Sequence, residues 1–481
     1  MWRIDDGCRP PDAELLEMAS LVEAHAEFFD RAKPIALARA PGRLDVMGGI
    51  ADYSGSLVLE WPLSAAAWVA AQADDRPFVA IRTTEAAELS AEDSVTLPLH
   101  ALAPARGPLD YESARAMLTA DPRRAWAAYA GGAVVVLHHS RGRSSVDGSR
   151  CLLHSKVPIG RGVSSSAAIE VAAMQALAAL AGIDLAGRDL ALLAQRVENS
   201  IVGAPCGPMD QMTAACGVRD HFLALLCQPA ELEPRVALPA ELEVWGLDSG
   251  IRHAVTGGDY GGVRVGAFMG YRIIAEESGF ASRLVAPGLV AVEDPRFRGY
   301  LANVSPSLWE ARFRDRVPAA LDGRSFLDRY QGHTDRVTQV DPSKNYAPRA
   351  CTEHPIYEHH RVQIFRALLE GGAKSEASRV LLGELMYQSH ASYGACGLGS
   401  DGTDLLVDLV REAGAGAGLY GAKIMGGGSG GTVAVLARSG RRRELDRIVA
   451  QYAIETGRPA ALIGGSSDGA LGYGVRWLLP A

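Results

Sequence analysis

One stretch of the chain limits its possible folds more than any other: Pro158-Ile-Gly-Arg-Gly-Val-Ser-Ser-Ser-Ala-Ala168. Apolar residues then recur at the spacing of one α-helix face, at Ile169, Ala173, Leu177 and Leu180. Glycines let a backbone approach a bulky anion closely, and the start of a helix offers unpaired N–H groups with a partial positive charge. Hydroxyl groups at the same place can bind a phosphate oxygen or a magnesium ion. The stretch therefore predicts a seat for a nucleoside triphosphate.

This stretch differs from the two commonest phosphate-binding loops. It lacks a Gly-Lys-Ser/Thr ending, and it lacks the third glycine of a G-x-G-x-x-G motif. Taken alone, a flexible turn before a core helix would be the better interpretation. A second glycine-rich loop, Lys423–Gly431, leads into an apolar strand pattern late in the chain. The phosphate seat is therefore favoured only if further segments support it.

The length of the chain predicts more than one domain. At 481 residues it exceeds the size of an ordinary single core. The stretch Pro229–Pro239 is the most linker-like, which places the expected domains at residues 1–240 and 241–481. Residues 284–350 are rich in proline and partly without a pattern, so we assign them no role.

Charge and cysteine content exclude several classes of protein. A net charge of −8, dispersed along the chain, argues against nucleic-acid binding. The seven cysteines are odd in number and form no C-x-x-C pair, which argues against a disulfide framework or a structural zinc site. The N-terminal residues lack the apolar region of a signal peptide, and the longest apolar run, Ala125–Leu137, is too short to cross a bilayer. We expect a cytoplasmic protein without a membrane or nucleic-acid partner.

Local patterns predict the elements that surround the glycine-rich stretch. A strand begins at Ala36 and is expected to break at Pro41-Gly42. Two separate strands are expected at residues 57–63 and 65–73. A helix is predicted over residues 188–201.

Five segments, in this order, resemble the motifs of the GHMP superfamily of small-molecule kinases (galactokinase, homoserine, mevalonate and phosphomevalonate kinases). They are Arg39–Asp45 with Asp52-Tyr53, Pro158–Ala168 with Val163 in place of a leucine, Cys206–Gln211, Asp248–His253, and Lys423–Gly431 with Gly427 in place of an alanine. The third and fourth segments narrow the resemblance to sugar kinases. The resemblance implies a two-domain α+β fold, with an N-terminal ribosomal-S5-like domain, a C-terminal ferredoxin-like domain and the active site in the cleft between them.

Among sugar kinases, three segments are similar to the kinase half of the plant L-arabinokinases. They are Ala38–Leu59, Gly299-Tyr-Leu-Ala-Asn-Val-Ser-Pro306 and His354-Pro-Ile-Tyr-Glu358. The plant enzymes carry an additional N-terminal half that resembles a glycosyltransferase. This resemblance implies ATP-dependent phosphorylation of the anomeric hydroxyl of L-arabinose.

The resemblance also implies roles for individual residues. ATP would be held by the phosphate motif, at Pro158, Gly160, Gly162, Val163, Ser164, Ser165, Ser166 and Ala167. Ser166 and Glu198 would share Mg²⁺, which prefers hard oxygen ligands. Asp210 would take the proton of the anomeric hydroxyl, and Arg43 would keep that carboxylate ionised.

The sugar would contact Asp52, the backbone of Gly207, and Tyr260. Asp45 stands where galactokinases have an asparagine, and its role in the sugar site stays open. Lys423 is either catalytic or part of a structural ion pair. The histidines make no metal site by their spacing.

One departure from the galactokinase motif favours a pentose. Galactokinases carry Gly-Glu-His-Thr-Asp-Tyr where this chain has Gly48-Gly-Ile-Ala-Asp-Tyr53, so Gly49 and Ile50 replace two polar residues that reach the C6 end of the sugar. L-arabinopyranose has the ring configuration of galactose without the hydroxymethyl group. Burying a C6 hydroxyl against Ile50 would cost roughly 1–3 kcal/mol, or about 10- to 100-fold in discrimination.

Two alternatives stay open. The first is a galactokinase or a kinase for galacturonate, which would require a cation near the C6 end, from Arg252 or Arg264. The second is a silent sugar sensor, although such a protein could have lost the serines or the aspartate that are present here. The expected partners are a small sugar and ATP, and the expected state is a monomer or a weak homo-oligomer.

Overall fold

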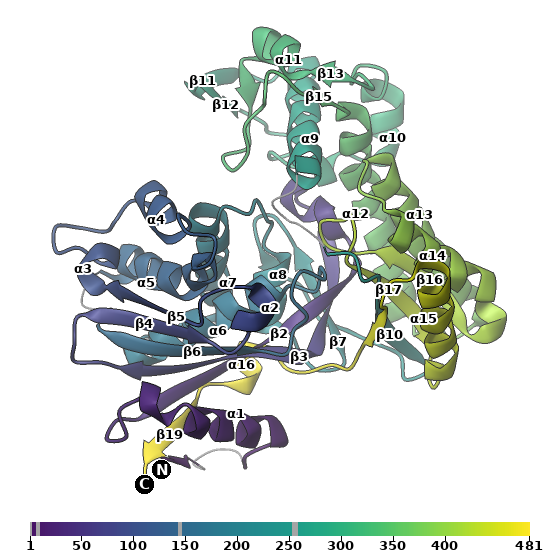
Figure 1. Ribbon diagram of the computed structural model, residues 1–481. Helices are drawn as coiled ribbons and strands as arrows, with labels where there is room; N and C mark the ends of the chain where they lie inside the picture. The colour runs from purple at the N-terminus through teal and green to yellow at the C-terminus, as the bar shows by residue number, and fades with distance from the viewer. Residues whose placement is uncertain (1, 6–9, 143–146, 253–257) are drawn as a thin grey trace.

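The computed structural model describes residues 2–5, 10–142, 147–252 and 258–481 (Figure 1). Its largest sheet has the strand order β1-β19-β2-β3-β6-β4-β5, with β7 joined to the first part of β3. The strands of this order are β1 (Trp2–Ile4), β19 (Arg476–Pro480), β2 (Ile35–Met47), β3 (Leu57–Ala73), β6 (Ser149–Ser155), β4 (Phe78–Thr83), β5 (Ser94–Pro98) and β7 (His221–Leu226). Only β4 and β6 pair in parallel among these strands.

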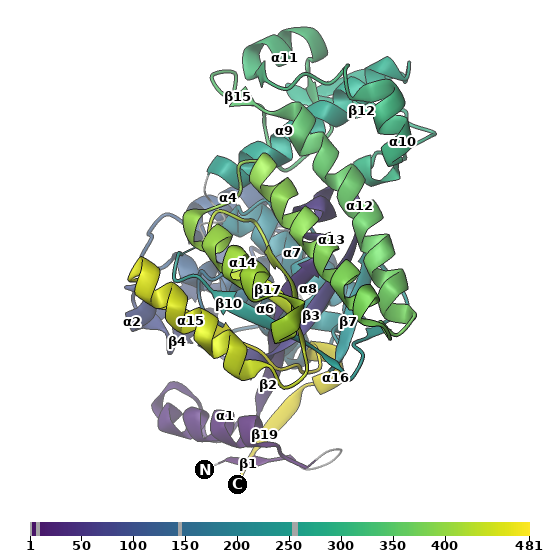
Figure 2. The same cartoon turned by 90° about the vertical axis from the view of Figure 1, so that its right-hand side faces the viewer.

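Helices cover this sheet on both faces. One face is covered by α5 (Ala128–Arg141), α6 (Ser165–Leu180), α7 (Gly187–Val197) and α8 (Met209–Cys216). Helix α6 lies at the centre of this layer, because it contacts β2 and β3 as well as α5, α7 and α8. Its many buried alanines let it pack closely against its neighbours. On the other face, α1 (Ala13–Ala24) closes a smaller apolar cluster with β1 and β19, where both ends of the chain lie (Figures 1 and 2).

Two strand predictions were wrong in the same way. β2 does not break at Pro41-Gly42 but continues through it, and β3 is one strand from Leu57 to Ala73. The pairing of the two strands shifts register between Pro41 and Arg43, so the proline, which has no N–H to donate, lies at a bulge. A Cβ atom at Gly42 would come 2.6 Å from the carbonyl oxygen of Val163, so this position must be glycine for the strand to pass the phosphate motif.

The second sheet has the order β16-β17-β10-β18, and all its pairs are antiparallel. Its strands are β16 (Leu419–Ile424), β17 (Thr432–Arg438), β10 (Leu242–Asp248) and β18 (Ala461–Ile463). Helices α14 (Asp401–Ala413) and α15 (Arg442–Thr456) pack on one side of it. An apolar cluster that contains Leu44 and Leu59 of the first sheet and Val244 and Leu436 of the second joins the two sheets.

The two sheets divide close to the expected boundary, since β10 begins at Leu242. We keep a division near residue 240 as a proposal. The last strand of the chain, β19, pairs with β1 and β2 of the first sheet. Helix α16 (Ala470–Tyr473), just before it, contacts α8 and β2.

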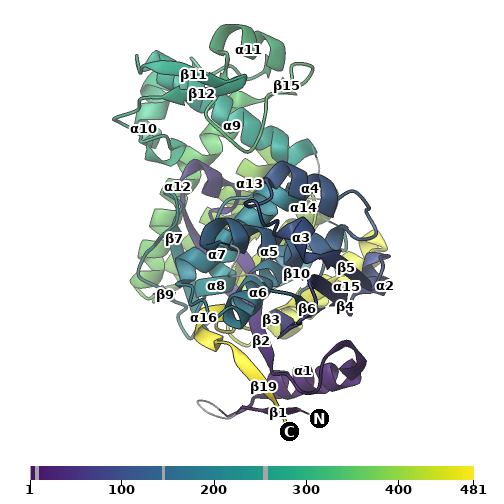
Figure 3. The same cartoon turned by 90° about the vertical axis from the view of Figure 1, so that its left-hand side faces the viewer.

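Residues 284–350, which were partly without a pattern in the sequence, form most of a separate lobe together with α9 (Gly258–Glu277) (Figures 1 and 3). The lobe contains a small sheet of β11 (Ser282–Ala286), β12 (Gly288–Val292) and β14 (Gly332–His333), and the helices α10 (Pro306–Leu308) and α11 (Gly323–Tyr330). Its apolar core includes Trp309, Phe313 and Phe326. The long helix α12 (Pro348–Glu370) runs from this lobe back to the rest of the molecule (Figure 2). In the described part of the chain, no helix is both long and apolar enough to cross a membrane.

Candidate active site

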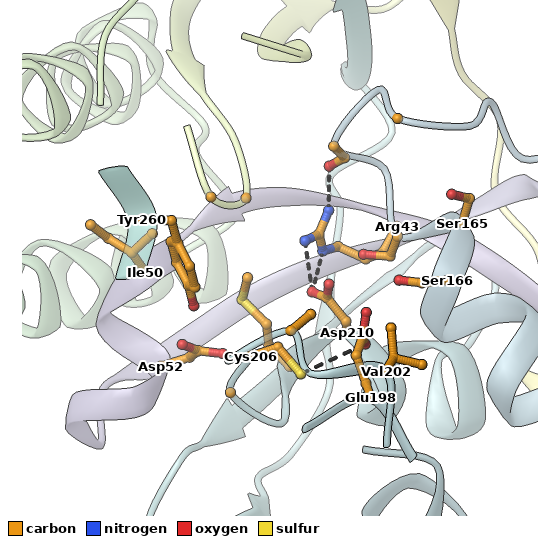
Figure 4. A pocket seen from close by; sticks show the side chains of 18 of the residues that line it. Arg43, Ile50, Asp52, Ser165, Ser166, Glu198, Val202, Cys206, Asp210 and Tyr260 are labelled. Atoms are coloured by element: carbon orange, nitrogen blue, oxygen red, sulfur yellow. Dashed lines mark hydrogen bonds and ion pairs between the residues drawn. The ribbon is translucent and has the colours of Figure 1, made fainter. Parts of the chain in front are cut away.

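A cavity of about 320 Å³ lies where several glycine-rich segments meet (Figure 4). Its walls come from η2 (Gly49–Ser54), the phosphate motif, the segment 204–210 and the second glycine loop. The lining residues are Arg43, Ile50, Asp52, Tyr129, Ile159, Gly160, Gly162, Ser164, Ser165, Ser166, Glu198, Val202, Ala204, Cys206, Gly207, Met209, Asp210, Tyr260, Gly426 and Gly427. In Figure 4, Asp210 lies between the serines on one side and Tyr260 and Ile50 on the other.

The phosphate motif forms a tight loop between β6 and α6. Gly160 and Gly162 have φ values of +68° and +71°, a conformation that glycine adopts without steric cost. Ser164 precedes the first helical residue with φ +61°, and its buried hydroxyl has no hydrogen-bond partner. Unpaired hydroxyl and N–H groups at a helix start suit a polyphosphate. The second glycine loop lies beside this motif, because Thr432 donates a 2.7 Å hydrogen bond to the carbonyl of Arg161.

Asp210 and Arg43 form the ion pair at the centre of the cavity. Asp210 lies in the first turn of α8, and the guanidinium of Arg43 approaches its Oδ1 at 2.6 Å (Nη2) and 2.9 Å (Nε). The Nη1 atom of Arg43 donates to the carbonyl of Gly162 at 2.7 Å, and Glu60 lies 3.2 Å from Nε. Burial opposes the charge of Arg43, but the carboxylates of Asp210 and Glu60 outweigh it and raise the pKa of Arg43 above its usual value. The pair is therefore held rigidly against the phosphate motif.

Two buried glutamates lie beside Ser166. The predicted helix ends at Val197, and Glu198 begins a π-helical turn (Glu198–Val202) of the kind that often occurs at functional sites. The side-chain amide of Gln211 donates to both Glu198 (2.5 Å) and Glu170 (3.0 Å). Burial raises the pKa of Glu198, although a hydrogen bond from Ser166 lowers it. The pKa of Glu170 is raised by burial and by the negative charge of the nearby Glu198.

This group of oxygen atoms fits a hard divalent cation. The Oε1 atom of Glu170 is buried without a hydrogen-bond partner, and Ser166 and Glu198 both line the cavity. A Mg²⁺ ion prefers one or two carboxylates beside phosphate oxygens and water. A cation would offset the cost of burying these carboxylates, which is the main cause of the raised pKa values of Glu198 and Glu170.

Asp52, Gly207 and Tyr260 surround the other end of the cavity. A Cβ atom added at Gly207 would come 1.9 Å from Oδ2 of Asp52, so the carboxylate lies directly against the backbone at Gly207. Burial and the charge of Asp210 raise the pKa of Asp52 to about 7, although Arg264 lowers it. Ile50 and Tyr260 line the same end and belong to one apolar cluster (Figure 4).

The comparisons with known proteins agree with this arrangement. The model of the GHMP kinases N terminal domain matches residues 128–218, that of the GHMP kinases C terminal matches 367–454, and the galactokinase galactose-binding signature matches 23–73. The L-arabinokinase of Arabidopsis thaliana is 42% identical over 94% of this chain, which spans only 47% of the plant protein. The galactokinase of Chloroflexus aggregans is 30% identical over 92% of this chain and 94% of its own length.

The chain belongs to the galactokinase family of GHMP kinases. It is a sugar kinase, and GHMP sugar kinases use ATP as the phosphate donor. The fold agrees as well, since the galactokinase of Lactococcus lactis, solved with galactose, superposes with a TM-score of 0.72 at 19% identity, over 94% of this chain and 99% of that one. The fold and family inferred from the sequence motifs are thus confirmed.

Most residues expected in the site of this galactokinase-family chain line the cavity. They are Arg43, Ile50, Asp52, Gly160, Gly162, Ser164, Ser165, Ser166, Glu198, Gly207, Asp210 and Tyr260. Pro158, Val163 and Ala167 lie outside the lining, and Val163 instead is buried and accepts a 3.1 Å hydrogen bond from the backbone N–H of Arg43. These three residues belong to the phosphate motif but do not face the cavity.

Asp45 and Gly49, expected to touch the sugar, do not line the cavity. Asp45 is fully buried and forms a 3.0 Å ion pair with Lys423, which is also fully buried. Its carboxylate also accepts hydrogen bonds from the backbone N–H groups of Gly49 (2.9 Å) and Gly426 (3.1 Å). An aspartate is required here because it compensates a buried cation. Of the two roles considered for Lys423, the structure shows the ion pair.

Sequence reasoning missed several residues of the site. Gln211 and Cys206 lie within a motif that was identified, but neither was assigned a role, and Gly426 belongs to the second glycine loop. Glu170 could have been found from helical spacing, because it follows Ser166 by four residues on α6. Tyr129 lines the cavity from α5, and its position depends on the packing of α5 against α6, for which the sequence gives no signal.

Proposed function

We propose that this chain transfers the γ-phosphoryl group of ATP, with Mg²⁺, to the anomeric hydroxyl of L-arabinose. The products would be L-arabinose 1-phosphate and ADP. The proposal draws on the L-arabinokinase of Arabidopsis thaliana as a relative, but this chain spans about half the length of that protein. The substrate must therefore be argued from the site itself.

The apolar wall at Ile50 carries the proposal. Ile50 lines the sugar end of the cavity beside Tyr260, at a position where the galactokinase motif has an imidazole. A C6 hydroxyl against this side chain would lose its water without gaining a partner, at a cost of about 1–3 kcal/mol. L-arabinopyranose presents only a ring methylene there, which an apolar wall accommodates.

Neither candidate cation for a uronic acid lines the cavity. The guanidinium of Arg264 forms two 2.8 Å hydrogen bonds with Asp335 and also donates to the carbonyls of Pro205 and Cys206. Arg252 is exposed and does not line the cavity. Galacturonate is therefore a poor fit to the described residues of this site.

Asp210 and Arg43 supply the chemistry of the transfer in this proposal. A carboxylate oxygen of Asp210 accepts the proton of the anomeric hydroxyl as the sugar oxygen forms its bond to the γ-phosphorus. The bond from the γ-phosphorus to the bridging oxygen of ADP breaks at the same time. Arg43 pairs with Asp210, and its position against Gly162 lets it offset the charge that develops on the phosphoryl group.

The phosphate motif would orient the donor for this step. The N–H groups at the start of α6 and the hydroxyls of Ser164 and Ser165 would bind phosphate oxygens. Ser166 and Glu198 would hold Mg²⁺, and Glu170 lies close to Glu198 through their shared partner Gln211. The bound cation would neutralise phosphate charge. Gln211 donates hydrogen bonds to both glutamates and so holds them in place.

A panel of sugars with the purified protein tests this assignment. ADP release is measured with L-arabinose, D-galactose and D-galacturonate under Mg²⁺-ATP, and phosphorus NMR identifies a 1-phosphate product. We expect kcat/KM for L-arabinose to exceed that for D-galactose by at least about tenfold. A preference for D-galactose would reassign the chain as a galactokinase, and sugar binding without ADP release would identify a sensor.

A further inference from the structure

Tyr393, on α13 (Glu376–Ala395), forms hydrogen bonds to two walls of the cavity, η2 and the second glycine loop, without lining the cavity itself. Its fully buried hydroxyl accepts a hydrogen bond from the backbone N–H of Ile50 at 2.9 Å and donates one to the carbonyl of Gly426 at 3.1 Å. Ile50 and Gly426 both line the cavity. One phenol group therefore connects the sugar end of the cavity with the second glycine loop.

The same hydroxyl fills the space of a side chain at position 49. A Cβ atom at Gly49 would lie 1.7 Å from the hydroxyl oxygen of Tyr393 and 2.8 Å from Cζ. Gly49 also has φ +48°, a conformation that side-chain-bearing residues rarely adopt. The galactokinase motif has a glutamate at this position, so Tyr393 and such a glutamate cannot occupy this backbone together.

The ring of Tyr393 is held on several sides. The ring of His354 lies nearly perpendicular to it at 5.1 Å between centroids, and the ammonium of Lys423 lies 5.1 Å from its centre. His354 belongs to the segment 354–358, whose Glu358 accepts a 3.0 Å hydrogen bond from the backbone N–H of Gly48. Helices α12 and α13 thus fix the backbone of residues 48–50 through side chains that do not line the cavity.

We propose that Tyr393 is a positioning residue that sets the sugar selectivity of this site. By excluding a side chain at residue 49 and holding the N–H of Ile50, it fixes the apolar wall that discriminates a sugar without a hydroxymethyl group from one that carries it. This inference rests on the proposed sugar-kinase site. The inference adds Tyr393 as the residue that holds the apolar wall at Ile50 in place.

Tyr393→Phe removes the hydroxyl and keeps the ring. The N–H of Ile50 and the carbonyl of Gly426 then lose their buried partner, and the wall becomes free to shift. We expect the ratio of kcat/KM for L-arabinose to kcat/KM for D-galactose to fall about tenfold, mainly through KM for L-arabinose. A protein fraction that fails to fold cancels in this ratio, because both sugars are measured on one sample.

Tyr387→Phe is the matched control, since Tyr387 lies on the same helix and its ring packs against Arg411 away from the cavity. We expect this variant to keep the wild-type ratio. A Tyr393→Phe variant with lowered Tm and an unchanged ratio would overturn the inference, because it would show a packing role alone. If Tyr393→Phe does not fold, Gly49→Ala presses on the same hydroxyl and must change the ratio for the inference to stand.

The two proposals fail separately. If the wild-type protein prefers D-galactose, the L-arabinose assignment is lost. The role of Tyr393 is still decided by whether the ratio changes in Tyr393→Phe and not in Tyr387→Phe.

Discussion

Asp52 is held in a position where its charge is costly. The side chain is buried, and both burial and the neighbouring Asp210 raise its pKa to about 7 from an ordinary value of 3.8, with a smaller contribution from Asp45. Arg264 is the opposing charge. Between these two pKa values the folded protein keeps a proton that the unfolded chain releases. The contribution of Asp52 to the free energy of unfolding therefore falls as pH rises from about 4 to 7 and is flat above the folded pKa.

Asp52→Asn removes this contribution, so the variant is expected to gain stability relative to the wild type as pH rises. The difference in free energy of unfolding should change by up to about 4 kcal/mol between pH 4 and pH 8. Urea denaturation of both proteins across this range measures it. The other buried acids are common to both proteins and cancel in the difference. Asp328→Asn, on the exposed face of α11, is the control, and a pH-independent difference for Asp52→Asn would contradict the assigned pKa.

Asp210→Asn tests the proposed role of Asp210 as the proton acceptor. The amide preserves the shape of the side chain but cannot take up a proton, so kcat is expected to fall by about 10²- to 10⁴-fold. Sugar-dependent ADP release measures the loss, and a thermal melt checks that the protein is folded. Asp328→Asn should leave kcat unchanged. Substantial residual turnover in folded Asp210→Asn protein would remove this residue from the mechanism.

At the scale of elements, the site depends on where secondary structure is interrupted. The helix expected over residues 188–201 changes to a π-helical turn at Glu198, which places that carboxylate beside Ser166. The segment between this turn and α8 carries Gly207 against Asp52. Such interruptions depend on packing against neighbouring elements, so periodicity in the sequence predicts the helix without its ending.

Gly207→Ala should damage the sugar site specifically. Because the new Cβ would lie 1.9 Å from Oδ2 of Asp52, either the carboxylate or the 204–210 segment must move. We expect KM for the sugar to rise at least about tenfold, with a smaller effect on KM for ATP. Steady-state kinetics with each substrate varied in turn separates these effects.

Gly394→Ala provides the comparison for Gly207→Ala. Gly394 lies in α13, and a Cβ there would meet nothing within 4 Å. Alanine is favoured over glycine in a helix by about 1 kcal/mol, so this variant should be as active as the wild type and slightly more stable. Equal kinetics in the two variants would show that the contact of Gly207 with Asp52 has no role in sugar binding.

At the scale of the whole molecule, one buried ion pair joins the two sheets. Lys423 is in β16 of the second sheet and Asp45 in β2 of the first, and neither side chain is exposed. The carboxylate of Asp45 also accepts hydrogen bonds from the N–H groups of Gly49 and Gly426, so it fixes both η2 and the second glycine loop at the cavity. The relative position of the two sheets thus determines the shape of the site.

Lys423→Met would leave the charge of Asp45 buried without its partner. We expect the free energy of unfolding to fall by about 3–5 kcal/mol, and the double variant Lys423→Met/Asp45→Asn to recover part of this loss. Chemical denaturation measures both. Lys156→Met, which breaks an exposed pair with Glu17, should change stability little. Similar losses in the two lysine variants would show that burial does not make the Lys423 pair important.

The family and the types of residue in the candidate site could be inferred from the sequence alone. The glycine loops and the helix start of the phosphate motif can be predicted from local sequence, because loop conformation and helix starts depend on residues close in the chain. The sequence also placed Asp210 with Arg43 through resemblance to known motifs, and the structure brings them to 2.6 Å.

Long-range packing determines which residues face the cavity and which lie behind its walls. Asp45 forms a buried ion pair with Lys423, and β19 pairs with β2 of the first sheet. Tyr393 bonds to the backbone of Ile50, which is 343 residues away in the chain. The physical reason is that these contacts join segments remote in sequence. Their partners are selected by burial and by the pairing of buried polar groups, and neither leaves a periodic signal in the chain.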